Sequence, residues 1–208
     1  LAHPELIKCS FGSYYGSIPK IRELAQSNKI EAYSLPQGQL SLLFREIARG
    51  SPGLISTVGK HTYVDPALGG GKLNDKTIKD VIDEIIIDGE KYLFYKSRPV
   101  DTALIRGSIA DKYGNISMLN EPVKTEFLAM AQAARSSGGK IYVQVSEVIN
   151  NKLQPNQIDL PQHLVDAFIL TKNLENDHRY TNKYVINKRL LQETNGKYEV
   201  EENNDPTH

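Results

Sequence analysis

The chain is poor in the features that mark several large classes of protein. Its one cysteine, Cys9, excludes a disulfide framework and is typical of a reducing compartment, so we expect a cytoplasmic protein. Lys and Arg together number 25, as do Asp and Glu, so no net positive field favours nucleic acid or an anionic membrane. No apolar run approaches the length of a membrane span. We therefore expect neither nucleic acid nor a membrane as a partner.

Several known catalytic and binding motifs are also absent, because the required residues do not stand at the required spacing. The Gly-Lys pairs that begin at Gly59, Gly71 and Gly139 lack the early glycine and the following hydroxyl residue of a phosphate-binding P-loop. Asn74 stands where a dinucleotide-binding fingerprint needs its third glycine. The histidines are scattered without metal-ligand spacing, so we expect no metal site. No Gly-x-Ser-x-Gly nucleophile elbow is present.

The most distinctive stretch is residues 53–74, which read GLISTVGKHTYVDPALGGGKLN. Glycine permits positive φ angles and lets another molecule approach the backbone closely. A glycine-dense loop of this length is usually either a binding loop or a disordered segment. The strand-like run Ile55–Val58 that leads into it argues against disorder. We therefore expect a ligand-binding loop here.

Extended and helical patterns alternate along the chain. Of its 208 residues 39% are hydrophobic, which is enough for one domain with a real core. Apolar spacing predicts helices over 18–25, 40–47 and 125–135. Extended patterns predict strands over 31–35, 54–58, 102–110, 116–119, 141–148 and 165–170, and a hairpin of 85–87 with 92–95. This alternation predicts an α/β fold with an open, largely parallel sheet flanked by helices.

The pattern changes towards the end of the chain. The β-branched runs 141–148 and 165–170 are typical of strands buried on both faces of a parallel sheet. Beyond residue 172 the alternation disappears, and 198–208 are acidic and rich in Asn. We therefore expect a domain over residues 1–172 and a linker or tail over 173–208. Because the chain starts at Leu1 without a Met, we also expect a processed or excised segment.

Pro36-Gln37-Gly38 stands between a predicted strand and a predicted helix. Free backbone N–H groups and the positive end of the helix dipole at such a junction favour an anionic or carbonyl oxygen. The amide of Gln37 adds a neutral donor suited to a developing oxyanion, and Gly38 lets a ligand approach the backbone. The alternative is an ordinary turn in which Gln37 caps the helix. The residues alone leave both interpretations open.

An ordered set of motifs gives the chain a family resemblance. The motifs are AYSLPQGQL at 32–40, LFREIA at 43–48, GKHTYVDP at 59–66 and GGGKLN at 69–74, with YLFY at 92–95, ALIRG at 103–107 and SGG at 137–139 further on. From about His3 to Leu170 this order resembles the first, alpha-like half of a family I CoA-transferase of the single-chain acetate or propionate type. The resemblance implies the CoA-transferase (NagB/RpiA-like) fold, incomplete at its N-terminus.

The resemblance also implies an activity. Such enzymes exchange CoA between a short-chain acyl-CoA and a carboxylic acid such as acetate or acetoacetate, through a glutamyl-CoA intermediate. Gln37 is then the oxyanion donor. The residues expected to contact CoA are Gly38, Gly59, Gly69, Gly70 and Lys72. For Lys72 a solvated loop lysine is the alternative to a phosphate contact. Acyl-CoA is a substrate in this scheme, and no permanently bound cofactor is expected.

The chain departs from the family pattern in three places. The family's nucleophile lies in a Glu-Ser-Gly or Glu-Asn-Gly motif of the second half, whereas this chain has Glu193-Thr194-Asn195-Gly196 in its polar tail. We therefore reject Glu193 and expect the nucleophilic glutamate outside the chain. The family's opening strand and glycine-rich turn are missing. Lys60-His61 replaces a small or apolar residue and a glycine, so His61 is either a ligand contact or a solvent-facing loop side chain.

These inferences leave more than one function open. The first hypothesis needs the C-terminal, beta-like half of the same enzyme as a partner, within a homo-oligomer. The second is a non-catalytic acyl-CoA-binding or assembly domain of the same fold. The third hypothesis is that the chain is related to sugar-phosphate isomerases or translation-factor-like proteins, which use similar α/β domains. The loop with Asp-Pro and Gly-Gly-Gly fits these proteins poorly.

Overall fold

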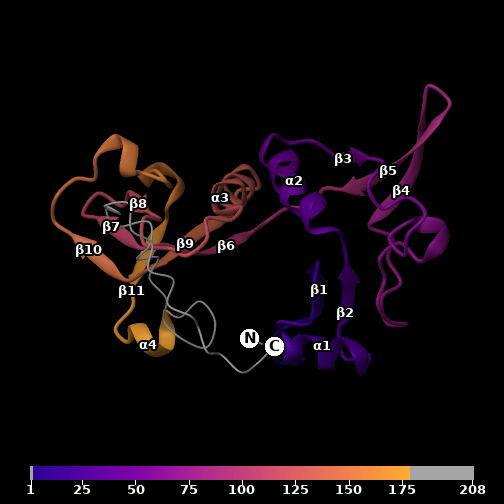
Figure 1. Cartoon of the computed structure of the whole chain (residues 1–208), viewed down its shortest axis with the longest axis horizontal. Coiled ribbons are helices and arrows are strands. Elements are labelled where there is room, and N and C mark those ends of the chain that lie inside the picture. Colours follow the sequence, from indigo (N-terminus) through magenta and orange to yellow (C-terminus); the bar gives the residue numbers. More distant parts are fainter. Residues whose placement is uncertain (1, 179–208) are drawn as a thin grey trace, which may run out of the picture.

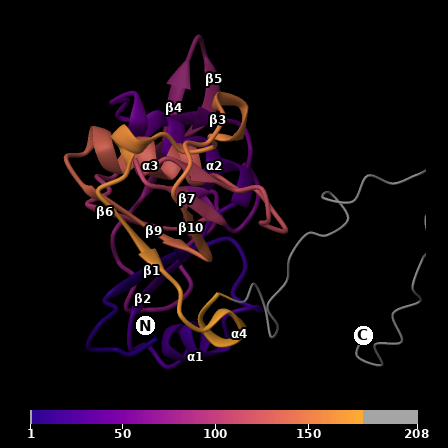
Figure 2. The same ribbon diagram turned by 90° about the vertical axis from the view of Figure 1, so that its left-hand side faces the viewer.

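The computed structural model describes residues 2–178, shown from two sides in Figures 1 and 2. The helices are α1 (Pro19–Gln26), α2 (Gln37–Ala48), α3 (Phe127–Ser136) and α4 (Leu174–Asp177), with 3-10 turns η1 (Pro66–Leu68), η2 (Pro155–Gln157) and η3 (Gln162–Leu164). The strands are β1 (Cys9–Gly12), β2 (Glu31–Ser34), β3 (Gly53–Ser56), β4 (Ile82–Ile87), β5 (Glu90–Lys96), β6 (Thr102–Arg106), β7 (Ile109–Asp111), β8 (Ile116–Ser117), β9 (Lys140–Val145), β10 (Glu147–Ile149) and β11 (Ala167–Leu170). Within residues 2–178 every helix is too short or too polar to cross a membrane.

The strands of the described part form four small sheets. β1 and β2 are parallel, and β11, β9 and β6 form a three-stranded parallel sheet in that order. β10 pairs in parallel with β7, which pairs antiparallel with β8. β3, β5 and β4 form an antiparallel sheet, whose β4–β5 hairpin stands out at the top of Figure 2. The predicted α/β class with parallel pairing and flanking helices is confirmed.

Two segments that the sequence predicted as single strands are each divided into two strands in the structure. The predicted strand over 102–110 splits into β6 and β7 at Gly107, where a Cβ would lie 2.6 Å from Ile116. The predicted strand over 141–148 splits into β9 and β10 at Ser146, whose backbone N–H and hydroxyl both donate to the carbonyl oxygen of Ser108. Both breaks depend on contacts between distant parts of the chain. At each break the chain passes from one sheet to another.

The prediction that residues 141–148 and 165–170 form strands buried on both faces of a sheet was wrong. In β9, Ile141, Val143 and Val145 are buried, whereas the alternate residues are half-buried or, at Lys140, exposed. β11 lies at the edge of its sheet, and its Ile169 is 58% exposed. α3 packs on one face of this sheet, so an apolar run alone did not distinguish one covered face from two.

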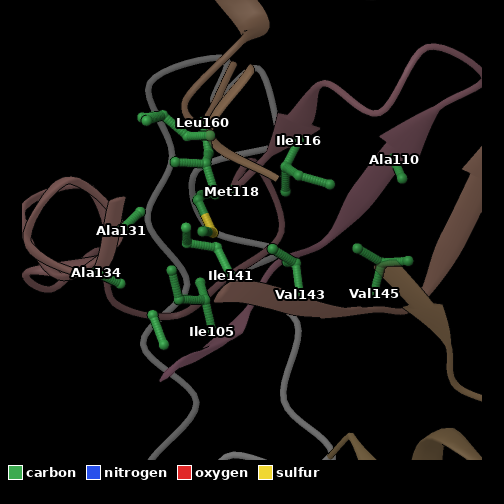
Figure 3. Packing of buried hydrophobic residues seen from close by; sticks show 12 residues of the cluster. Ile105, Ala110, Ile116, Met118, Ala131, Ala134, Ile141, Val143, Val145 and Leu160 are labelled. Carbon is green, nitrogen blue, oxygen red and sulfur yellow. The ribbon is translucent and has the colours of Figure 1, made fainter. Parts of the chain in front are cut away.

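The largest core lies between α3 and the β6–β9–β11 sheet, with β8 and the end of η3 around it (Figure 3). Ile105, Ile141 and Val143 form the sheet side. Ala131 and Ala134 lie on α3, and these small side chains let the helix approach the sheet closely. Each fully buried aliphatic side chain of this kind stabilises the fold by about 1.5–3 kcal/mol.

A second core lies where β2, α2 and the β3–β5–β4 sheet meet. Its fully buried members are Tyr33, Leu35, Val64, Val81, Ile82, Leu93 and Tyr95. Leu40 and Leu43 of α2 pack against this cluster. Their spacing is helical, so the same residues that predict α2 also fix which side of it is buried. This core holds the start of α2 against the end of β2.

Candidate functional site

The sequence-predicted site centres on the junction of β2 and α2. Pro36 is the N-cap, and Gln37 is the first residue of the helix, three residues earlier than the predicted start. The carbonyl oxygen of Pro36 accepts from the N–H groups of Gln39 and Leu40. The N–H groups of Gln37 and Gly38 therefore lie outside the helical ladder, at the positive end of the dipole. This end of α2 can stabilise a carbonyl oxygen or an anion.

The side chain of Gln37 is exposed, and within residues 2–178 no hydrogen bond holds it. The N-cap residue also makes no side-chain capping bond. The alternative in which Gln37 caps the helix is therefore unsupported. Gly38 is exposed too, and a Cβ built there meets no atom within 4 Å. A ligand can approach this turn of backbone from solvent.

The glycine-rich loop lies beside the same junction. The N–H of Ser34 donates to the carbonyl oxygen of Gly71 at 2.8 Å, and the hydroxyls of Ser34 and Tyr63 are 3.1 Å apart. Gly71 has a φ of +74°, and a Cβ there would lie 2.8 Å from the carbonyl oxygen of Ser34. Only glycine fits so close to β2 in this backbone conformation. The loop therefore reaches to within three residues of Gln37.

Asp65 organises the loop from inside. Its carboxylate accepts from the backbone N–H of His61 at 2.9 Å and from that of Ala67 at 3.1 Å. These two N–H groups hold the pKa of Asp65 below its ordinary value. His61 has a φ of +61°, a conformation rare for a side chain of its size. The bond to Asp65 explains how the loop keeps this shape although residue 61 is not a glycine.

Two of the predicted glycines form the turn of the loop, and a third has a packing role. Gly69 and Gly70 have φ angles of +128° and +64°, with no atom closer than 3.6 Å to a Cβ at either position. At Gly59 a Cβ would lie 2.6 Å from the hydroxyl of Tyr95, which itself donates to the carbonyl oxygen of Val58. Burial raises the pKa of Tyr95 to about 12, so this donor keeps its proton. Gly59 lies against the hairpin rather than beside Gln37.

Lys72, the predicted phosphate contact, already has a partner. Its ammonium lies 2.5 Å from the carboxylate of Asp80, and its side chain is 28% exposed. Lys60 donates to the carbonyl oxygen of Lys91. A phosphate contact by Lys72 requires exchange of Asp80 for the ligand, so this role stays a prediction.

Sequence reasoning missed three polar residues near the junction. Ser34 and Tyr63 tie the loop to β2, and both lie within motifs quoted for the family resemblance, although no role was predicted for either. Gln39 is 6% exposed, and its buried Oε1 has no hydrogen-bond donor in the described part of the chain. A Gln at the third helical position commonly accepts from the N-cap N–H, but the N-cap here is Pro36, which has none. A proline at the N-cap followed by a Gln at the third helical position is the sequence pattern from which an unpaired Oε1 on Gln39 could have been predicted.

The described residues hold no cluster of three or more His, Cys, Asp or Glu side chains suited to a metal ion. Glu193 lies outside the described residues, as does nearly all of the predicted tail. The part of the tail that is described forms α4, and His178 after it is buried against Glu121. The boundary at residue 172 stays a prediction.

Comparison with known proteins gives the chain its family. Over 159 residues it is 44% identical to the caffeate CoA-transferase of Acetobacterium woodii, covering 76% of this chain and 30% of the relative. Over 171 residues it is 37% identical to the acetate CoA-transferase YdiF of Escherichia coli K12, covering 82% of this chain and 32% of that relative.

A solved structure agrees with these relatives. The acyl-CoA transferase YdiF of E. coli O157:H7, in a thioester complex with CoA, matches with a TM-score of 0.84 at 33% identity, over 97% of this chain and 38% of that one. The chain spans about a third of the length of these relatives. The family model described as coenzyme A transferase matches residues 1–170. The chain belongs to the coenzyme A transferase family.

Proposed function

We propose that this chain is the alpha-like part of an enzyme that exchanges CoA between a short-chain acyl-CoA and a carboxylic acid such as acetate or acetoacetate. The family match over residues 1–170 supports the reaction class. The names of the two relatives support a carboxylic acid as acceptor. Because the chain spans about a third of those relatives, the complementary, beta-like half is the partner that the activity requires.

In the proposed reaction a glutamate outside this chain is the nucleophile. Its carboxylate oxygen attacks the thioester carbonyl, the C–S bond breaks, and CoA leaves as the thiolate, so that a mixed anhydride of the acyl group and the glutamate is formed. The thiolate then attacks the glutamyl carbonyl and releases the first carboxylic acid as its carboxylate. The acceptor carboxylate reverses both steps. Each attack places negative charge on a carbonyl oxygen, which must be stabilised by aligned donors.

The observation that carries the proposal is the exposed amide of Gln37 on the first turn of α2. Its position beside two backbone N–H groups outside the helical ladder suits an oxyanion. Gly38 leaves space for the thioester, and Gly69 and Gly70 shape the nearby loop as a wall for CoA. Gly59 contributes through the packing of that loop, and Lys72 contacts a CoA phosphate when it releases Asp80.

A chimaera tests the proposal. This chain replaces the matched 171 residues of the E. coli acetate CoA-transferase, and exchange of CoA between acetyl-CoA and labelled acetate is measured. We expect exchange in the chimaera and a loss of about 100- to 1000-fold in kcat for Gln37→Ala. Gln132→Ala, which truncates an exposed glutamine on α3, is the matched control and should leave kcat unchanged. Equal activity of the two variants would show that Gln37 is not the oxyanion donor.

The second candidate is a non-catalytic acyl-CoA-binding or assembly domain of the same fold. The ion pair of Lys72 with Asp80 favours it, because a lysine held this way contributes little to a charged substrate. A chimaera that binds CoA in calorimetry but exchanges none would favour this candidate. Its oligomeric state, predicted to be a homo-oligomer, can be measured on the same sample by sedimentation.

A further inference from the structure

One edge of the antiparallel β3–β5–β4 sheet is open. β4 is the last strand of this sheet, and within residues 2–178 no strand pairs with its outer side. The carbonyl oxygen of Val81 accepts from the N–H of Lys96 on β5, and backbone groups alternate in direction along a strand. The N–H and C=O groups of Glu84 and Ile86 therefore point away from β5, towards the open edge.

The open edge is exposed and lacks the usual protection of an edge strand. The β4–β5 hairpin projects from the rest of the molecule at the top of Figure 2, and Ile86 is 66% exposed. Edge strands of soluble proteins are commonly protected by lysine, proline or a bulge. β4 has none of these: it reads Ile-Asp-Glu-Ile-Ile-Ile and pairs with β5 without interruption. Such an edge is suited to pairing with a further strand.

The two acidic side chains of β4 are neutralised within the hairpin itself. Glu84 forms an ion pair with Lys91 at 2.9 Å, and Asp83 forms one with Lys96 at 2.7 Å. Both lysines belong to β5, so neither pair needs a group from outside the hairpin. A strand that pairs with this edge therefore needs no positive charge of its own. This favours a neutral, apolar partner strand with the character of β4 itself.

We propose that β4 pairs antiparallel with β4 of a second copy of this chain, around a two-fold axis at Ile85. In this register Ile85 lies opposite the partner's Ile85. Glu84 lies opposite the partner's Ile86, so no two like charges face each other directly. The outward-pointing backbone groups of Glu84 and Ile86 then exchange hydrogen bonds with the same groups of the second copy.

The same register forms a continuous apolar row across the interface. Tyr92 on β5 lies opposite Ile85 in the hairpin. The row therefore runs from Tyr92 to Ile85 of one copy and on to the partner's Ile85 and the partner's Tyr92, and cross-strand pairs of aromatic and β-branched side chains are favourable. Because the axis is two-fold, each copy uses its own β4 edge and the contact closes as a dimer. The proposal concerns assembly and does not depend on the proposed CoA exchange.

Disulfide trapping tests the register. The Cα atoms of a non-hydrogen-bonded antiparallel pair are about 4.5 Å apart, a distance that a disulfide spans. In a Cys9→Ser background, Ile85→Cys should therefore form a covalent dimer under mild oxidation, both in the 208-residue chain and in the chimaera. Ile86→Cys is the matched control. It is well exposed, but in this register it lies on the order of 8 Å from the partner's residue 86, too far for a disulfide.

The expected result is a covalent dimer with Ile85→Cys alone. Equal yields from the two variants would indicate random contact between copies, and no dimer from either would show that the edge takes no second copy. A dimer of the chain that is absent from the chimaera would show that the beta-like half covers the edge. Each of these three outcomes would overturn the proposal. The readout is independent of CoA transfer, so an inactive chimaera does not affect it.

A second pair of variants measures the dimer without oxidation. Ile86→Lys places a charge on the open edge, which is how natural edge strands avoid pairing. Ile169→Lys places the same charge on β11, another edge strand, at a side chain that is 58% exposed. In sedimentation experiments Ile86→Lys should weaken dimerisation by roughly tenfold or more, and Ile169→Lys should leave it unchanged. Equal dissociation constants for the two variants would contradict pairing through β4.

Discussion

The hydroxyl of Tyr63 lies 3.1 Å from the hydroxyl of Ser34 and ties the glycine-rich loop to the strand that leads into Gln37. Because Ser34 is buried and Tyr63 is half exposed, one partner is fixed by the core and the other lies at the surface. The loop and the start of α2 are thus held in one arrangement by side chains as well as by the backbone bond of Ser34 to Gly71.

Removing this contact should weaken substrate binding. Tyr63→Phe deletes only the hydroxyl, and a lost hydrogen bond of about 0.5–1.5 kcal/mol corresponds to a roughly two- to tenfold lower kcat/KM in the chimaera. The change should be in KM, since Tyr63 positions the loop without touching the reacting atoms. Tyr113→Phe is the control, because Tyr113 is equally exposed and lies on the distant β7–β8 turn. A fall in kcat alone would contradict this role.

A side chain at Gly71 should destabilise the chain. Gly71→Ala places a Cβ 2.8 Å from the carbonyl oxygen of Ser34 in a backbone with φ of +74°. The expected loss in the free energy of unfolding is about 1–3 kcal/mol, measured by urea denaturation. Gly38→Ala is the comparison, since a Cβ there meets nothing and the position is helical. If both variants unfold at the same urea concentration, the close approach of the loop to β2 is absent in solution.

Asp65 should make the stability of the loop depend on pH. Its folded-state pKa is lowered by the N–H groups of His61 and Ala67, so its contribution is complete above the unfolded pKa of about 3.9 and is lost as pH falls through the folded value. Asp65→Asn should therefore lower the urea midpoint at pH 7 and change it much less at pH 3. Asp88→Asn, in the exposed hairpin turn, should leave both midpoints unchanged. A deficit of Asp65→Asn that is equal at both pH values would refute this linkage.

Glu121 should hold α4 on the domain. Its buried carboxylate forms an ion pair with Arg106 at 2.6 Å and lies 3.4 Å from Nε2 of His178, which follows α4. Burial raises the pKa of Glu121, but the hydrogen bond of His178 and the charge of Arg106 bring it below its ordinary value. Breaking such a buried pair costs at most about 3–5 kcal/mol.

Glu121→Gln should accordingly speed amide exchange over residues 174–177 and lower Tm. Glu147→Gln on β10 is the control, because Glu147 is exposed. Unchanged exchange over 174–177 in Glu121→Gln would mean that α4 is held by other contacts.

Local patterns predicted the elements that depend on neighbouring residues. The β4–β5 hairpin follows from Asp88-Gly89, whose φ angles of +51° and +83° belong to a two-residue turn. α2 follows from its apolar spacing, and the end of that helix follows from Gly50 with a φ of +76°. In these cases the residues that determine the structure are also the ones that form it.

The features that the sequence did not predict depend on distant partners. The breaks at Gly107 and Ser146 arise from contacts with Ile116 and Ser108. At the candidate site, the Gly-Gly-Gly motif predicted a binding loop, but the partner of Lys72 is Asp80, which no spacing connects with it. Exposure of β11 likewise depends on what covers the second face of its sheet, which an apolar run does not encode.

The bonds that Asp65 accepts within its own loop have a thermodynamic consequence. Ordering a backbone costs about 1–2 kcal/mol of conformational entropy for each residue. In this loop that cost is offset during folding, by Asp65 from within and by Ser34 from the neighbouring strand. A ligand that binds against it meets a surface that already has its shape, so more of the free energy of contact is left for affinity.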